Sequence, residues 1–240
     1  MSLYHTFKFW LLIFLLSFFL SILAIFSRLI DHTGNLAQRI SGLWARLLCK
    51  WNGVKVEVVG MENIRLDKAQ IFVANHQSFF DIFALSGYLS VPIIWVAKAS
   101  LFRIPFLGWA MKAAGYISVE RENRKMAYKA FLETIERVKA GYSLVIFPEG
   151  TRSEDGSIGP FKKGSHLLAQ RSNTPMVPVT IVGSGKIIKK GSGMIKPGGI
   201  RIVVSAPVSC PQKDIGKGEN ILAGIRDTIL RNYEKNLDKI

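Results

Sequence analysis

The chain has 240 residues, with 32 Lys and Arg against 17 Asp and Glu, a formal net charge of +15 and 49% hydrophobic residues. This length suits one α/β unit with a buried core and an appendage, and it is short for two independent domains. The basic balance indicates an anionic partner such as nucleic acid, a phosphate-bearing metabolite or a membrane surface, whereas Cys49 and Cys210 lack the spacing of a disulfide framework or a zinc site.

The first predicted element is the uncharged apolar run 9–27, between Lys8 and Arg28. It is just long enough to cross a bilayer core. A cleaved signal peptide is the alternative, although no A-x-A site follows the run. Because basic residues follow it, the positive-inside rule predicts an anchor in the inner (cytoplasmic) membrane, with the remaining chain on the cytoplasmic face.

An amphipathic helix is predicted next, over 34–51. Its apolar residues recur at helical spacing, with cations on the other face. We expect it to lie on the membrane surface, with Gly34 and Asn35 permitting a turn before it; a helix that packs on the core is the alternative. The predicted organisation is therefore residues 1–52 as a membrane-associated helical hairpin, made of an anchor helix plus an amphipathic interfacial helix, and residues 53–240 as an α/β domain. Sequence leaves open whether the anchor spans the bilayer or turns back within one leaflet.

The remaining sequence alternates short apolar runs with longer helical patterns, which predicts an α/β fold with a mostly parallel central sheet flanked by helices. The expected strands are 54–59, 70–74, 93–97, 116–119, 143–147, 176–182 and 200–205. The expected helices are 79–89, 105–114, 124–140, 161–171 and 220–237. The Gly-, Lys- and Ser-rich stretch 183–199 is expected to be a flexible basic excursion rather than an element.

The first candidate site follows strand 70–74 and reads Asn-His-Gln-Ser-Phe-Phe-Asp, ending at Asp81. Open α/β sheets place their sites at the carboxyl ends of strands. A histidine there can accept a proton from a hydroxyl, and a carboxylate can hold the other ring nitrogen, which makes His76 and Asp81 a candidate dyad. The alternative is a capping box from Ser78 to Asp81, with His76 as an ordinary loop residue.

The second candidate site follows strand 143–147 and reads Phe-Pro-Glu-Gly-Thr-Arg-Ser from Phe147 to Ser153. Glycine allows the backbone to approach a ligand closely, and an arginine fork matches phosphate oxygens. This pattern favours an anion-binding loop, and a solvated turn with a Glu–Arg surface pair is the alternative. Lys98 and Arg121 also follow strands, so with Arg152 three cations are expected at one sheet edge.

Together these motifs resemble the glycerolipid acyltransferase family, in particular the 1-acylglycerol-3-phosphate acyltransferases. The H-x4-D motif of that family matches His76 and Asp81, its second motif is similar to 115–121, its F-P-E-G-T-R-S motif matches 147–153, and its Val-Pro motif is similar to 177–179. A nucleophile elbow, an H-E-x-x-H motif, a complete P-loop and a G-x-G-x-x-G motif are all missing from the sequence.

The resemblance implies that His76 is the general base and Asp81 its orienting partner. Arg121, Glu149, Gly150, Thr151 and Arg152 would bind the glycerophosphate, and Lys98 would assist. No metal and no resident cofactor are implied, because the acyl donor is a substrate. The N-terminus of the helix at 79–89 is a candidate source of oxyanion donors.

The expected partners are membrane lipids, lysophosphatidic acid, and the thioester of coenzyme A or of acyl-carrier protein, with no nucleic acid. Sequence leaves the choice of thioester and the oligomeric state open. Acylation of glycerol 3-phosphate or of another lysolipid is an alternative function. A non-catalytic membrane protein that binds lipid or nucleic acid through its charge is a second alternative.

Overall fold

The computed structural model describes residues 2–120, 122–162, 164–210 and 218–240. Its central six-stranded sheet has the order β1-β8-β7-β2-β6-β3. Neighbouring strands run parallel except for β7 and β8, which are antiparallel, so the predicted mostly parallel sheet is confirmed. In chain order the strands are β1 (Val54–Val59), β2 (Ile71–Ala74), β3 (Ile93–Ile94), β6 (Ser143–Ile146), β7 (Met176–Val182) and β8 (Gly198–Val204).

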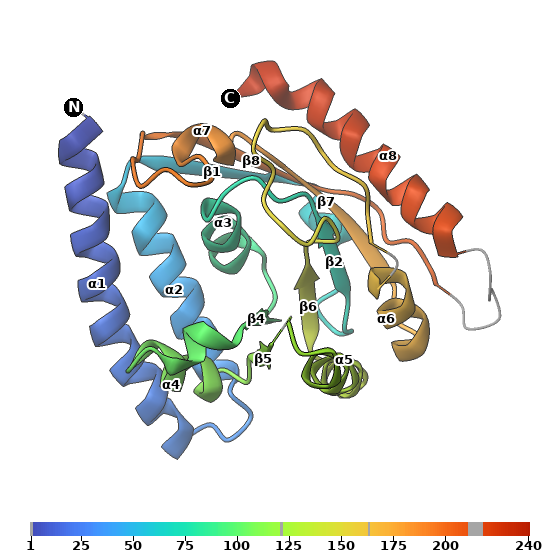
Figure 1. The fold of residues 1–240 in the computed structure, drawn as a ribbon, viewed down its shortest axis with the longest axis horizontal. Helices are drawn as coiled ribbons and strands as arrows, with labels where there is room; N and C mark the ends of the chain where they lie inside the picture. Colours follow the sequence, from blue (N-terminus) through green and yellow to red (C-terminus); the bar gives the residue numbers. More distant parts are fainter. Residues whose placement is uncertain (1, 121, 163, 211–217) are drawn as a thin grey trace.

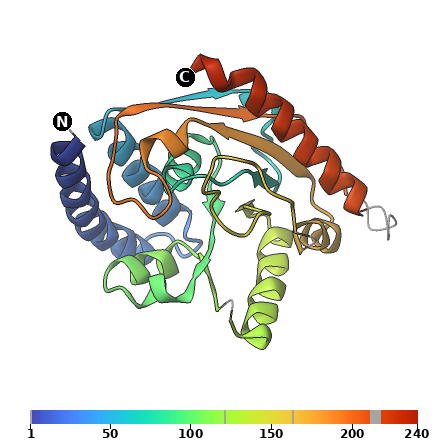
Figure 2. The ribbon, with the colours of Figure 1, turned by 45° about the horizontal axis from the view of Figure 1, so that its top comes forward.

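Helices cover both faces of this sheet (Figures 1 and 2). One face packs on α1 (Ser2–Phe26), α2 (Asn35–Trp51), α3 (Phe80–Tyr88) and α7 (Ser184–Ile187), and the other on α5 (Arg124–Lys139), α6 (Gly164–Ser172) and α8 (Gly218–Asn236). The helix α4 (Leu107–Ala113) lies against α1. Short 3₁₀ turns occupy Ser27–Leu29, Met61–Asn63, Ala99–Arg103 and Leu237–Lys239.

The central strand β2 is buried on both faces, which is why its sequence is a continuous apolar run. Phe72 and Ala74 belong to the core under α2 and α3, whereas Ile71 and Val73 belong to the core under α5, α6 and α8. Since β2 ends at Ala74, the loop that carries His76 begins at the middle of the sheet edge.

The prediction of one strand over 93–97 is wrong, because the segment forms two short strands, β3 and β4. The chain leaves the central sheet at Trp95, and β4 (Val96–Lys98) pairs in parallel with β5 (Ile117–Val119) as a separate two-stranded sheet. The indole of Trp95 is buried and donates to Ser86 Oγ at 3.0 Å, which fixes the chain where it changes sheet. Lys98 therefore does not end a strand of the central sheet.

The core-packing alternative is confirmed for α2, and its expected position on a membrane surface stays a prediction. Its small residues Gly42 and Ala45, with Leu48, are buried, and α2 packs against α3, so it is part of the core. Leu43 and Trp51 are exposed on its outer side. The turn before it uses Gly34 at φ 88°, where an added Cβ would lie 2.9 Å from the carbonyl oxygen of Ala113.

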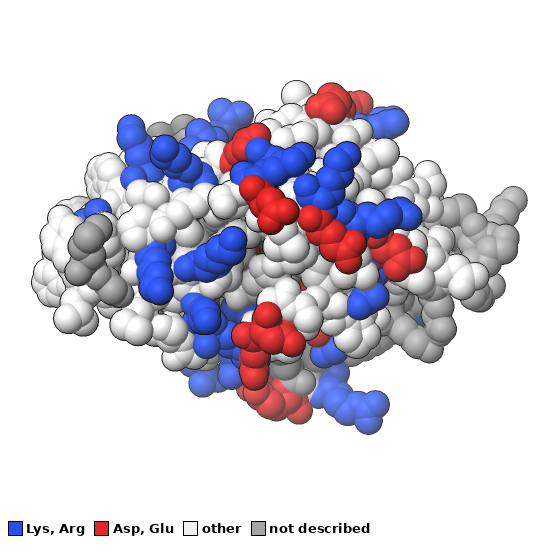
Figure 3. Space-filling model, turned by 90° about the horizontal axis from the view of Figure 1, so that it is seen from above, with Lys and Arg blue, Asp and Glu red and all other residues white. Residues whose placement is uncertain are grey.

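The segment Leu3–Leu29, which includes nearly all of α1, is long and apolar enough to cross a bilayer, and little of it is buried. The end of the molecule that α1 occupies is almost free of charged side chains, whereas Lys and Arg predominate over the rest of the same face (Figure 3). This segment is consistent with membrane association.

The expectation of a flexible excursion over 183–199 is wrong. The segment contains α7, and Ile187, Ile188 and Ile195 are buried in the core on the α3 side of the sheet. It is also tied to α1, because Trp10 Nε1 donates to the carbonyl oxygen of Gly193 at 3.1 Å. Three isoleucines spaced among basic and small residues are enough to anchor the segment.

Candidate active site

The His76 and Asp81 side chains meet as predicted. Nδ1 of His76 lies 2.8 Å from Oδ2 of Asp81. Because a carboxylate only accepts hydrogen bonds, Nδ1 carries the shared proton and Nε2 is left with its lone pair. The histidine side chain is 14% exposed and the carboxylate is fully buried, so Nε2 is the atom of the pair that a ligand can reach.

Asp81 also holds the loop that presents the histidine. Its Oδ2 accepts from the backbone N–H of Gln77 at 2.7 Å and of Ser78 at 2.8 Å, while Ser78 Oγ accepts from Phe80 N at 3.3 Å. Only half of the capping box considered as the alternative is present, because Asp81 accepts from Ser78 N while Ser78 Oγ accepts from Phe80 N and not from Asp81 N. One carboxylate in the first turn of α3 serves both purposes, since His76 precedes the helix.

The loop after β6 is bonded to the His76 loop in both directions. Oε1 of Glu149 accepts from His76 N at 2.8 Å, and Ser153 N donates to the carbonyl oxygen of His76 at 2.8 Å. Oε2 of Glu149 accepts from Gly159 N at 3.0 Å. The backbone on each side of the His76 ring is therefore fixed by the loop 147–153, and Glu149 acts here as a positioning residue.

Burial raises the pKa of Glu149 above its ordinary value, and the N–H groups of Gly159 and His76 oppose that shift. A protonated carboxyl would lose acceptor strength towards both backbone donors. The role of Glu149 as a direct ligand for the glycerophosphate stays a prediction.

Two further side chains, Phe147 and Asn75, hold His76 and its loop in place, and the motif spacing gave neither of them this role. The Phe147 ring stacks on the His76 ring, with centroids 3.8 Å apart at 11°. Asn75 is buried and pairs with the backbone of Ile181 through two hydrogen bonds of 2.8 Å, which fixes the loop to β7. Phe147 is the first residue of the F-P-E-G-T-R-S motif and Asn75 directly precedes His76, but only the fold reveals what they contact.

The candidate anion-binding residues lie on the loop after β6 as predicted. Arg152 is half-buried, with its guanidinium 4.0 Å from the centroid of the Phe79 ring, next to the dyad loop. Gly150 has φ 77°, and an added Cβ would lie 2.6 Å from Nζ of Lys162. Lys162 is thus a further cation at this loop, while Thr151 is exposed.

Lys98 is not joined to this group. Lys98 ends β4, where it pairs with Val119 and forms an exposed ion pair with Glu122 at 3.7 Å. Arg121 lies outside the described residues. The sequence predicted that three cations, Lys98, Arg121 and Arg152, would lie at one edge of the central sheet. This prediction is wrong for Lys98, because β4 belongs to the smaller sheet.

Three N–H groups near the start of α3, the expected source of oxyanion donors, are already hydrogen-bonded within the protein. The N–H groups of Gln77 and Ser78 bind Asp81, and that of Phe80 binds Ser78 Oγ. The first two stabilise the dyad carboxylate, which a buried charge requires, and the source of the oxyanion donors stays a prediction.

Alternative nucleophiles and metal centres find little support. Burial raises the pKa of Cys49 to about 12 and that of Cys210 to about 11, so both thiols are protonated at neutral pH. Within the ranges that the structure describes, His, Cys, Asp and Glu form no cluster of three or more that could hold a metal ion. The arrangement is instead suited to general-base chemistry beside a cationic loop.

Comparison with known proteins gives a consistent result. A family model described as Acyltransferase matches residues 55–182. The 1-acyl-sn-glycerol-3-phosphate acyltransferase BAT2, a chloroplastic protein of Brassica napus, is 36% identical over 73% of this chain and 51% of its own length. The protein of that name from Borreliella burgdorferi is 31% identical over 76% of this chain and 73% of its own length.

A solved structure is similar over nearly the whole chain. The crystal structure of the 1-acyl-sn-glycerophosphate (LPA) acyltransferase PlsC from Thermotoga maritima has a TM-score of 0.85 at 28% identity, covering 98% of this chain and 95% of that one. The chain spans about half the length of the plant relative.

The geometry predicts which imidazole nitrogen carries the proton. In neutral His76 the proton should reside on Nδ1, and Asp81→Asn should shift the population towards the Nε2-protonated form, because the new amide can offer a donor to Nδ1. ¹⁵N NMR of histidine-labelled protein measures this tautomer ratio. An unchanged ratio in Asp81→Asn, with the exposed Asp67→Asn as the matched control, would argue against the assigned contact.

Proposed function

The chain belongs to the acyltransferase family, and we propose that it transfers a fatty acyl group from a thioester to the sn-2 hydroxyl of 1-acylglycerol 3-phosphate, giving phosphatidic acid for phospholipid biosynthesis. The observation that carries the proposal is the 2.8 Å contact between His76 Nδ1 and Asp81 Oδ2 beside the loop of Arg152. Supporting it, curated relatives named for this acceptor are 36% and 31% identical over 73% and 76% of this chain.

In the proposed reaction, Nε2 of His76 removes the proton from the acceptor hydroxyl as its oxygen attacks the thioester carbonyl. The buried carboxylate of Asp81 stabilises the imidazolium that forms and keeps the ring in place. The tetrahedral intermediate then collapses with cleavage of the carbon–sulfur bond, and the imidazolium returns its proton to the leaving thiolate. Direct transfer needs no covalent acyl-enzyme, in keeping with the two protonated thiols.

The acceptor phosphate is proposed to bind at the loop after β6. Arg152 offers a planar fork for phosphate oxygens, Lys162 adds a second charge over Gly150, and the backbone at Gly150 can approach closely because it has no side chain. Arg121, Thr151 and Lys98 are retained as proposed contributors to binding of the glycerophosphate.

The donor is proposed to be acyl-coenzyme A or acyl-carrier protein, used as a substrate without a resident cofactor. Both are acidic, which suits a chain of formal net charge +15. We further propose that α1 anchors the protein in the inner membrane with the site on the cytoplasmic face, where both donors are found. The exposed apolar surface of α1 supports its proposed role as a membrane anchor.

Removal of the base tests the proposal. His76→Ala should reduce transfer of labelled acyl groups onto lysophosphatidic acid by ~10²–10⁴-fold, because a positioned base supplies that much. Rates are measured in detergent micelles with each thioester in turn. His166→Ala, in α6 and half-buried, is the matched control and should retain most of the rate. Equal rates for wild type and His76→Ala would exclude His76 as the base.

The proposed binding of phosphate by Arg152 can be tested separately from the stacking of its guanidinium on Phe79. Arg152→Gln should raise the KM for lysophosphatidic acid about tenfold or more, since a charge-assisted bond to phosphate is lost. Arg171 also lies over a phenylalanine ring, at 5.8 Å from the centroid of Phe131, so Arg171→Gln removes a similar cation–π contact. Steady-state kinetics that show the same KM change in both variants would assign Arg152 a structural role only.

A further inference from the structure

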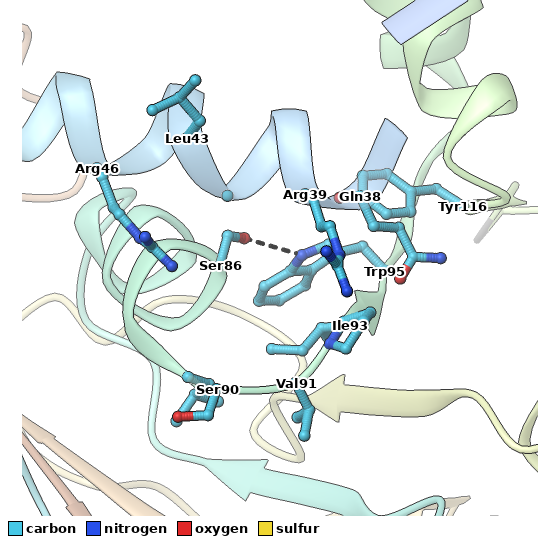
Figure 4. Close-up of a pocket in the computed structure, with 13 residues that line it drawn as sticks. Gln38, Arg39, Leu43, Arg46, Ser86, Ser90, Val91, Ile93, Trp95 and Tyr116 are labelled. Atoms are coloured by element: carbon cyan, nitrogen blue, oxygen red, sulfur yellow. Dashed lines mark hydrogen bonds between the residues drawn. The ribbon is translucent and has the colours of Figure 1, made fainter. Parts of the chain in front are cut away.

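A pocket of about 390 Å³ opens between α2, the end of α3 and the segment that leads into β3. It does not include the His76–Asp81 dyad. Figure 4 shows Arg39 and Arg46 reaching from α2 towards its floor, with Ser86, Ser90, Val91 and Trp95 on the opposite side. The pocket is therefore lined by α2 and by the segment 86–95, which lie far apart in the sequence, together with Tyr116.

The lining of this pocket is cationic. It contains Arg39 and Arg46 and no Asp or Glu. Nε of Arg46 donates to the carbonyl oxygen of Gly87, which holds that guanidinium at the pocket wall. Arg39 forms no hydrogen bond or ion pair with the described residues, so its fork is available to an anion. Two guanidinium groups around a concave space suit the oxygens of a phosphate.

A buried acceptor in the same lining lacks a partner. Gln38 is 5% exposed, and its Nε2 donates to the carbonyl oxygen of Ala114 at 3.0 Å. Its Oε1 is buried without a hydrogen-bond partner in the described part of the chain. A buried amide oxygen calls for a donor, and a ligand hydroxyl beside the phosphate would provide one.

The rim of the pocket is apolar on the side of α2. Leu43 lines the pocket and is 47% exposed, and Leu36 and Trp51 are exposed on the same helix. The neighbouring α1 exposes an apolar surface of its own, and α1 packs against α2. A pocket with a cationic interior and an apolar rim, next to the apolar helix α1, suits a lipid anion better than a small water-soluble anion.

We propose that this pocket binds the headgroup of an anionic phospholipid that carries a free hydroxyl, the chemistry of a glycerol phosphodiester. Arg39 and Arg46 hold the phosphate, Gln38 Oε1 accepts from the hydroxyl, and the acyl chains leave over Leu43. The site is distinct from the catalytic loop, from which it is separated by the Trp95 and Phe147 rings, whose centroids lie 6.0 Å apart. The proposal does not depend on which acceptor the enzyme acylates.

The test is isothermal titration of the full chain, in micelles of an uncharged detergent, with dihexanoyl phosphatidylglycerol. Phosphatidylcholine with the same chains corrects for partition into micelles, and glycerol 1-phosphate and inorganic phosphate test for a water-soluble ligand. Arg39→Gln removes the unpaired guanidinium without breaking a contact within the protein. Lys50→Gln removes an exposed charge from the same helix outside the pocket and is the matched control.

Saturable binding of phosphatidylglycerol is expected, weakened about tenfold in Arg39→Gln and within twofold of wild type in Lys50→Gln. Arg39→Gln/Arg46→Gln should abolish it. Glycerol 1-phosphate or inorganic phosphate binding as tightly as the lipid would overturn the lipid as ligand. Binding that Arg39→Gln leaves unchanged, or that phosphatidylcholine reproduces, would overturn the site itself.

Discussion

The carboxylate of Asp81 is the interaction on which the rest of the site depends. It is fully buried, and its Oδ2 accepts from the His76 ring and from two backbone N–H groups of the preceding loop. A buried charge is tolerated only when it is paired and hydrogen-bonded. The hydrogen bonds that compensate this buried charge therefore also set the tautomer of His76 and the backbone conformation before α3. As a result, the imidazole ring and its loop are positioned together.

The central sheet supplies the frame for that interaction. The loops after β2 and β6 leave from neighbouring parallel strands, and contacts of Glu149 and Ser153 with the His76 backbone join them (Figure 1). Phe147, at the end of β6, covers the imidazole ring. His76 and Arg152 lie on loops, and Asp81 lies in the first turn of α3, so rigid elements hold all three side chains.

Local sequence patterns predicted the parallel sheet and the pairing of His76 with Asp81. Both depend on residues that are close together in the sequence: the apolar runs mark the strands, and the two side chains are five residues apart across the start of a helix. They did not reveal that the apolar run 93–97 passes from the central sheet to the smaller sheet at Trp95, whose indole donates a hydrogen bond to Ser86. Nor did they reveal the burial of Ile187, Ile188 and Ile195, which depends on contacts with α1 and the sheet. Tertiary packing decided both.

The central claim is that His76 and Asp81 act as one unit, and a double-mutant cycle tests it most directly. Acyl transfer to lysophosphatidic acid is measured for His76→Ala, Asp81→Ala and the double variant under identical conditions. The account predicts that the double variant is no more than a few-fold slower than His76→Ala alone, because the carboxylate acts through the ring. Rate losses that multiply would show that the two residues contribute independently and would contradict the dyad.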